Sequence, residues 1–233
     1  MSRWKLAQDY EKNWWLDQSN KIDLTFYKNF AKEITELLKP FIKIDQNTKI
    51  LEIGSGAAGI ITHLNSNKRY AIDPLEKFYS TIPKYKNYRD REVSYFAAEG
   101  EHLPFKNEFF DLIIMDNVLD HCSKPNQVLL EVKRVLKQNG IFYFRQNTYH
   151  LWGRFIRAIM EIFLIDKGHP HTFSKNSLHK ILQNLGFEIL YRKSDGYLST
   201  WLWEVKSNRI IDKIKAVLFV NRDKYTLILR KIS

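Results

Sequence analysis

The chain has 233 residues, a length typical of one α/β domain with a substantial hydrophobic core. It contains no apolar run of 18 or more residues, its first residues lack an apolar signal segment, and its single cysteine is Cys122. These features exclude an internal disulfide and a thiolate metal site, and they predict a cytoplasmic protein without a membrane-spanning segment.

The net charge of +11 is unevenly distributed along the chain. Residues 1–116 contain 17 basic and 17 acidic residues, whereas residues 117–233 contain 20 basic and 9 acidic residues. The second half is therefore expected to present a basic surface, which suits phosphate, nucleic acid or an anionic membrane surface. A basic face that is merely solvated is the alternative.

The first 40 residues are expected to form a helical cap segment. Residues 3–20 carry an aromatic content too high for a disordered tail, with Trp4, Tyr10, Trp14 and Trp15. Residues 22–38 repeat apolar positions at helical spacing, and Pro40 stops that helix.

A glycine-rich turn follows the first predicted strand, residues 50–53. Gly54 and Gly56 remove side chains where the backbone must turn sharply or approach a ligand, and a helix over residues 57–65 is expected to point its free amides at the same place. The second predicted strand, residues 69–73, ends in Asp73, 21 residues after Glu52. An acid at that spacing accepts hydrogen bonds from a ribose in dinucleotide-binding folds.

The next strands bring further polar residues to the same edge. The third strand, residues 93–97, is followed by Glu99 and Glu101, and the fourth, residues 111–116, is apolar inside as in a central parallel strand. Its carboxyl end delivers Asp116, Asn117, Asp120 and His121 to the edge where open α/β sheets bind ligands. A helix over residues 126–138 and a fifth strand, residues 141–144, come next.

The second half contains two unusual segments. Residues 150–167 are apolar around most of a helix, which indicates either burial or an apolar lid or membrane-facing surface, and residues 195–218 include Trp201 and Trp203. Between them, His169 and His171 lie on one proline-containing loop without an evident acid or thiolate partner, so no metal site is predicted. Residues 225–230 form the last predicted strand.

Five ordered motifs resemble those of the class I S-adenosylmethionine-dependent methyltransferases, in particular the broad group that acts on small molecules and lipids. They are Leu51–Gly56, Asp73, Ala98–Phe105, Phe110–His121 and Glu131–Gly140. The resemblance implies a Rossmann-like, doubly wound, three-layer α/β/α fold, with a seven-stranded, mostly parallel sheet whose last strand is antiparallel and lies beside the fifth. It places the methyltransferase domain at residues 41–233, with helical elaborations at 150–167 and 195–218.

The resemblance also implies S-adenosyl-L-methionine as cofactor and suggests residue roles. The cofactor-binding residues would be Glu52, Gly54, Ser55, Gly56, Asp73, Pro74, Glu99, Gly100, Asp116 and Asn117. Glu101 would cap its loop, and the substrate-side candidates are His121, Tyr149, Trp152 and His171. His121 is a weak candidate for a general base, because a methyl sulfonium is already activated and a dedicated base is unnecessary. Ala58 departs from the pattern, since many members have a glycine there.

The predicted function is methyl transfer to a small-molecule or lipid- or glycan-linked acceptor, with peripheral contact to an anionic membrane surface. Methylation of tRNA or rRNA is a second reading, supported by the charge excess but by no recognisable RNA-binding module. A non-catalytic, cofactor-binding partner subunit is a third, since fold does not fix function.

Overall fold

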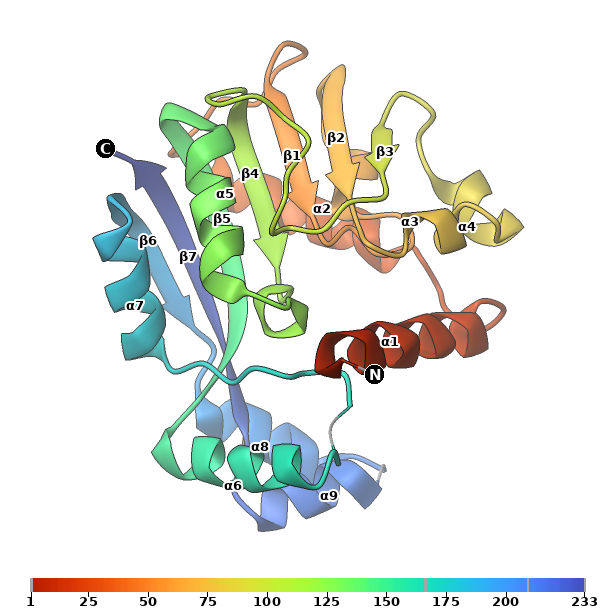
Figure 1. Cartoon of the computed structure of the whole chain (residues 1–233), viewed down its shortest axis with the longest axis vertical. Helices are drawn as coiled ribbons and strands as arrows, with labels where there is room; N and C mark the ends of the chain where they lie inside the picture. Colours follow the sequence, from red (N-terminus) through yellow and green to blue (C-terminus); the bar gives the residue numbers. More distant parts are fainter. Residues whose placement is uncertain (1, 166, 209, 233) are drawn as a thin grey trace.

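A computed structural model describes residues 2–165, 167–208 and 210–232. Positions 1, 166 and 209, which belong to the predicted segments 1–40, 150–167 and 195–218, and position 233 lie outside the described residues. A seven-stranded sheet in the order β3-β2-β1-β4-β5-β7-β6 forms the centre of the molecule (Figure 1). Its strands are β1 (Lys49–Ile53), β2 (Lys68–Ile72), β3 (Ser94–Phe96), β4 (Phe110–Asp116), β5 (Leu136–Tyr149), β6 (Phe187–Ser194) and β7 (Arg222–Lys231).

The strand pairing confirms the predicted fold class. Strands β3, β2, β1, β4 and β5 pair in parallel, and β7 pairs antiparallel with both β5 and β6. The last strand of the chain is therefore inserted beside the fifth, as expected. The parallel strands all end at one edge of the sheet, where the polar residues that follow them gather.

Two hydrophobic layers cover the two faces of the sheet. Along β4, Ile113 and Met115 pack with α5 (Pro125–Val135) and α7 (Lys175–Asn184), while Leu112 and Ile114 pack with α2 (Phe26–Leu38) on the other face. This division follows from the two-residue period of a strand. Short helices α3 (Glu76–Tyr79) and α4 (Pro83–Tyr88) extend the second layer.

Two predicted helices are shorter than expected. The helix predicted over residues 57–65 is wrong, because only a 3₁₀ turn, η1 (Ile60–His63), forms there. Gly59, directly before this turn, has φ +77°, and Leu64, directly after it, is extended. Neither residue has a helical conformation, so the helix cannot extend beyond residues 60–63 in either direction. The helix predicted to reach residue 138 ends at Val135, because β5 begins at Leu136.

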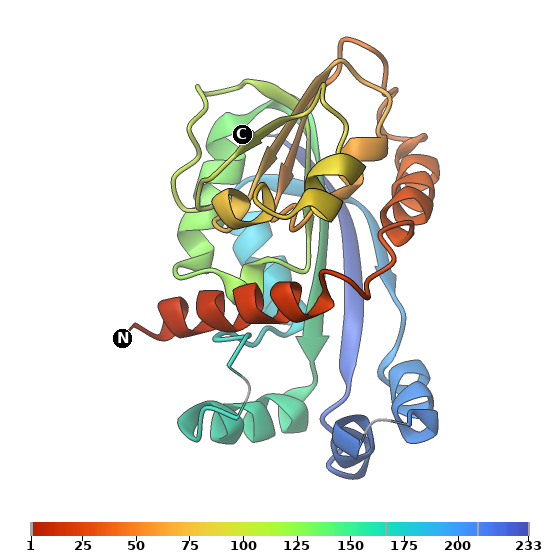
Figure 2. The same ribbon diagram turned by 90° about the vertical axis from the view of Figure 1, so that its right-hand side faces the viewer.

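Strands β5 and β7 run beyond the body of the sheet and carry a separate helical layer. The layer consists of α6 (Leu151–Ile162), α8 (Tyr197–Lys206) and α9 (Ile210–Val217), which lie together below the carboxyl edge in Figures 1 and 2. Trp152 Nε1 donates a hydrogen bond to the Leu218 carbonyl (2.9 Å), which links α6 to the end of α9. Among the described residues, no helix has the length and apolar character needed to cross a membrane.

Helix α1 (Arg3–Gln18) lies across the carboxyl edge of the sheet (Figure 2). It buries only Ala7 and Trp15, and its first residue, Arg3, forms a bidentate ion pair with Glu161 of α6. The residues predicted to fold onto the rest of the chain thus contact both the sheet edge and the helical layer. Few buried side chains hold α1, so it is anchored mainly through Trp15.

Candidate functional site

The glycine turn after β1 is built from residues in left-handed backbone conformations. Gly54 has φ +71° and Gly56 has φ +59°, a region that side chains with a Cβ rarely adopt. The backbone amides of Gly54 and Ser55 both donate hydrogen bonds to the Ile72 carbonyl, at 2.9 and 3.2 Å. A Cβ on Gly54 would lie 2.3 Å from Val118 Cγ2. The turn is therefore clamped between the end of β2 and the segment after β4.

Glu52 holds this turn from within the protein. Its carboxylate accepts hydrogen bonds from the amides of Ile60 (3.2 Å) and Ile61 (2.9 Å). Burial raises the pKa of Glu52 to about 8, although these two amide bonds favour the charged form. Two of the amides that were expected to face a ligand thus donate to Glu52, and these two hydrogen bonds give Glu52 a structural role.

Asp73 connects the end of β2 to the glycine turn. Its Oδ2 accepts a hydrogen bond from the Gly56 amide and its Oδ1 accepts one from the Leu75 amide, both at 2.9 Å. Burial raises the pKa of Asp73 to about 6, against the effect of these two hydrogen bonds. The predicted ribose acceptor is therefore fixed in orientation directly beside the turn.

Three buried oxygen atoms near this edge have no hydrogen-bond partner among the described residues: Ser55 Oγ in the glycine turn, Asp116 Oδ2 at the end of β4, and Asp120 Oδ1 in the segment after β4. The other Asp116 oxygen accepts from Arg145 Nε at 2.8 Å, and burial raises the pKa of Asp116 to about 6. Buried polar atoms are normally paired, so Ser55 Oγ within the glycine turn and Asp116 Oδ2 at the end of β4 are atoms that a polar ligand would satisfy.

The remaining predicted cofactor residues surround this edge. Asn117 has φ +54°, and its Oδ1 accepts a hydrogen bond from the Asn147 amide (3.1 Å). Glu99 is half-buried, Gly100 is buried against Val128, and Pro74 is exposed. These positions agree with a ligand that runs along the ends of β1 to β4.

Glu101 has the capping role that was predicted for it. Its side chain is buried, and Oε1 accepts hydrogen bonds from the amides of Ser123 (2.7 Å) and Lys124 (2.9 Å). Both amides precede α5, so Glu101 fixes the loop that leads into this helix.

Aromatic side chains of α1 and α2 cover the glycine turn. A Cβ on Gly56 would lie 3.2 Å from the Tyr27 hydroxyl and 3.3 Å from Trp15 Cζ2. Trp15 also packs edge-on against Tyr79 and Tyr85, with ring centroids 5.7 Å apart in each case. Trp15 therefore lies over the glycine turn, whereas Trp14 is 42% exposed. The site is a covered one rather than an open cleft.

The substrate-side candidates fall into two groups. His121 lies in the 3₁₀ turn η2 (Leu119–His121). His171 is close to the same turn, because its amide donates a hydrogen bond to the carbonyl of Asp120, the residue before His121 (3.3 Å). Tyr149 joins the same loop, because its amide donates to the Phe173 carbonyl (2.9 Å). Trp152, by contrast, belongs to the helical layer.

The structure also brings together residues that the sequence did not connect. His169 lies beside His121, with ring centroids 4.5 Å apart, and Asp120 belongs to the same cluster. The assumption that the histidine loop lacks an acidic partner was therefore wrong. The sequence carried no signal for this partner, because Asp120 lies 49 residues before His169.

Comparisons with known proteins agree with this geometry. Residues 51–144 match a family described as a methyltransferase domain. An uncharacterized protein of Methanocaldococcus jannaschii, MJ1123, is 32% identical over 136 residues, which cover 58% of this chain and 56% of that protein. Sterol 24-C-methyltransferase of Candida albicans is 25% identical over 167 residues, which cover 65% of this chain and 43% of that protein. The chain spans about half the length of these two curated relatives.

A solved structure shares the fold. Geranyl diphosphate C-methyltransferase of Streptomyces coelicolor A3(2), in complex with geranyl diphosphate and S-adenosyl-L-homocysteine, superposes with a TM-score of 0.63 at 12% identity and covers 86% of this chain and 78% of that one. The strand order, the motif-bearing edge and the family match of residues 51–144 all support the resemblance to the class I S-adenosylmethionine-dependent methyltransferases, whose cofactor is S-adenosyl-L-methionine.

Proposed function

We propose that the protein transfers a methyl group from S-adenosyl-L-methionine to a small-molecule, lipid- or glycan-linked acceptor. One observation carries the cofactor half of the proposal. The glycine turn contains Ser55 Oγ, and the fixed carboxylate of Asp73 and the buried Asp116 Oδ2 lie at the ends of the two neighbouring strands; among the described residues, Ser55 Oγ and Asp116 Oδ2 have no hydrogen-bond partner. A ligand with hydroxyl and ammonium donors and a positive charge matches that set of acceptors.

The residues at this edge would hold the cofactor in separate parts. Asp73 would accept from the ribose hydroxyls, Asp116 and Asn117 would meet the methionine part, and Glu99 would meet the adenine amine. When bound, the sulfonium supplies an activated methyl group. The protein's contribution is then to fix the approach of the acceptor and to exclude water, for which Trp15 and Tyr27 over the turn are well placed.

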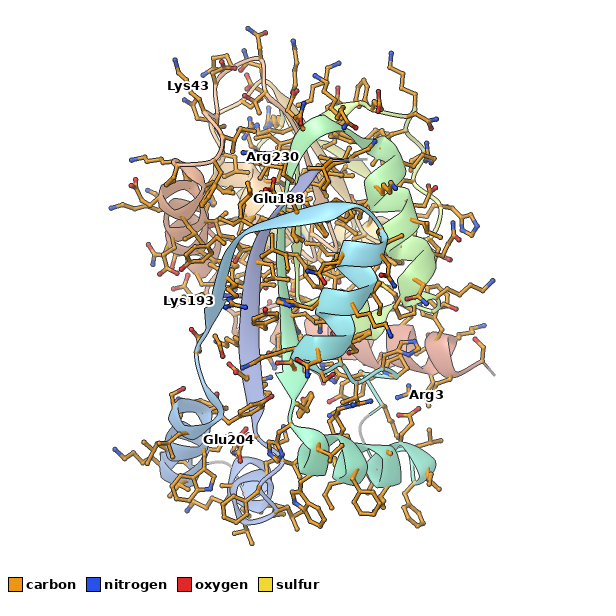
Figure 3. All side chains as sticks on the ribbon, turned by 90° about the vertical axis from the view of Figure 1, so that its left-hand side faces the viewer. Arg3, Lys43, Glu188, Lys193, Glu204 and Arg230 are labelled. Atoms are coloured by element: carbon orange, nitrogen blue, oxygen red, sulfur yellow. The ribbon has the colours of Figure 1, made fainter. Side chains whose placement is uncertain are left out.

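The helical layer supports an apolar acceptor presented at a membrane surface. Large apolar side chains project from α6, α8 and α9 away from the sheet, at the lower end of Figure 3. The most exposed on these helices are Leu151 (82%), Ile210 (77%), Val217 (76%), Ile162 (76%), Leu198 (68%), Trp203 (58%) and Phe155 (57%), and the segment directly after α6 adds Phe163 (70%) and Ile165 (60%). A patch of this kind on three neighbouring helices marks an interaction surface rather than scattered exposure.

Basic side chains near this apolar patch indicate that its partner is an anionic lipid surface. Arg154, Lys206 and Lys213 are exposed on the same three helices, and the basic excess of the chain lies in its second half. Apolar side chains that enter the acyl boundary, together with cations that attract anionic headgroups, bind peripheral proteins to membranes. The sterol methyltransferase and the geranyl diphosphate enzyme are named for molecules with a large hydrocarbon part, which agrees with such a surface.

Vesicle sedimentation tests the membrane half of the proposal. The protein should pellet with phosphatidylglycerol vesicles, less with phosphatidylcholine vesicles, and less at high salt. Replacing Phe155 and Trp203 by serine should weaken vesicle binding by at least about tenfold per residue, because each buries an aromatic side chain worth roughly 1.5–3 kcal/mol. Leu130→Ser, on α5 and 47% exposed, is the matched control and should bind like the wild type. Equal binding by all variants would contradict this surface.

Labelled methyl transfer tests the acceptor class. Protein incubated with methyl-labelled cofactor and a fractionated cell extract should place the label in the organic-phase fraction. Label found only in the RNA fraction, with binding to tRNA that falls steeply with salt, would replace this proposal by the RNA methyltransferase reading. Cofactor binding without label in any fraction would favour the non-catalytic reading.

A further inference from the structure

Three potential metal ligands meet between two loops that are far apart in the sequence. Asp120 and His121 belong to η2 after β4, and His169 lies in the loop between α6 and α7. One ligand atom from each side chain lies within 4.8 Å of the other two. A carboxylate and two imidazoles form the set of ligands found in many zinc and iron sites.

The backbone around the cluster is held on both sides. The Leu119 amide donates to Gln146 Oε1 (3.1 Å), which fixes η2 to β5. Arg157 Nη2 of α6 donates to the His169 carbonyl (3.2 Å), which fixes the loop. The His171 amide donates to the Asp120 carbonyl and joins the two segments. The side chains are thus brought together by the fold rather than by a chance contact of mobile loops.

Asp120 gives a second, independent indication of a ligand. The residue is only 4% exposed, and its Oδ1 has no hydrogen-bond partner among the described residues. That same oxygen faces His121 Nε2 at 3.9 Å, which is beyond hydrogen-bond distance. A buried carboxylate oxygen without a partner is strongly unfavourable, whereas a cation between Asp120 and the imidazoles would satisfy it.

We infer that Asp120, His121 and His169 bind one divalent transition-metal ion of the zinc class. Ligand atoms around Zn²⁺ lie about 3.3–3.4 Å apart when each is about 2.0–2.1 Å from the ion in a tetrahedral site. The ion would therefore draw the three side chains slightly closer than they lie here. Three protein ligands leave at least one coordination position open, as in sites that bind a water or a substrate oxygen.

Zinc titration against a chromophoric chelator tests this inference without cofactor or acceptor, so its outcome is independent of methyl transfer. The wild-type protein should bind one equivalent of Zn²⁺. Asp120→Asn and His169→Gln should each weaken zinc binding by at least about 100-fold, because each removes a direct ligand. His171→Gln, two positions further on the same loop, is the matched control and should stay within about threefold of the wild type.

Further measurements separate ligation from misfolding and from non-specific binding. Circular dichroism and thermal melts should show that Asp120→Asn and His169→Gln remain folded, and Co²⁺ in place of Zn²⁺ should give visible absorption bands that these variants lose. The inference is overturned if the wild type binds no stoichiometric Zn²⁺, if His171→Gln loses as much affinity as His169→Gln, or if Mg²⁺ binds equally well, since Mg²⁺ prefers oxygen ligands.

Discussion

Gly54→Ala is expected to destabilise the protein by about 2–5 kcal/mol and to abolish cofactor binding. A left-handed conformation costs an alanine roughly 1–2 kcal/mol, and forcing a methyl group into a packed site costs about 1–3 kcal/mol more. Both apply here, because Gly54 has φ +71° and its Cβ would lie 2.3 and 2.8 Å from the two Val118 methyl groups. Urea unfolding followed by tryptophan fluorescence measures the loss.

Two controls separate the two contributions. Gly196→Ala also replaces a glycine with positive φ (+88°), but its Cβ would meet only Ser199 Oγ at 3.9 Å, so it should show only the conformational cost of a positive-φ alanine, roughly 1–3 kcal/mol. Val118→Ala should relieve the contact and make Gly54→Ala less costly in that background. If Gly54→Ala costs no more than Gly196→Ala, the close packing of the turn against Val118 is wrong.

Arg89→Met is expected to destabilise the protein by about 3–5 kcal/mol, because it leaves a buried carboxylate without its partner. Arg89 donates to both oxygens of Glu76, at 2.7 and 2.8 Å, and the two side chains are 7% and 11% exposed. Its Nε also donates to the Ala57 carbonyl at 2.7 Å, so the substitution should loosen the glycine turn as well. Thermal and urea unfolding measure the effect.

A double-mutant cycle isolates this ion pair. Arg89→Met in a Glu76→Met background should cost less than in the wild type, with a coupling energy of about 1–3 kcal/mol. The exposed pair Lys39–Glu36, with side chains 63% and 57% exposed, serves as comparison and should couple by less than about 1 kcal/mol. Equal coupling in the two pairs would contradict the buried role of Arg89.

The sequence predicted the body of the sheet but not its extension. Short apolar runs identified the strands, and the motif order implied their topology, including the inserted last strand. Strand β5, however, was predicted for residues 141–144 and extends to Tyr149. Its distal part contains Gln146 and Thr148, which are fully buried by pairing with β7, as in Thr148 with Asp223. Polar residues buried by strand pairing leave no apolar pattern to detect.

The candidate site was predictable where neighbouring residues act together and unpredictable where distant ones meet. Gly54, Gly56 and Asp73 gather at the turn as their spacing implied. The loss of the expected helix depends on Glu52 capturing the Ile60 and Ile61 amides, which is a contact of the folded chain. Likewise, Asp120 meets His169 only because the loop after α6 returns to the edge of the sheet. No local sequence pattern predicts the path of that loop.

The most direct test of the proposed cofactor site is calorimetric titration of S-adenosylhomocysteine into the wild type, Asp73→Asn and Asp195→Asn. We predict about micromolar binding by the wild type, a loss of about 10–100-fold in Asp73→Asn, equal to roughly 1.4–2.8 kcal/mol, and no change in Asp195→Asn, whose carboxylate is 43% exposed on the loop after β6. Absence of binding to the wild type, or unchanged binding by a folded Asp73→Asn protein, would contradict the cofactor site at the glycine turn.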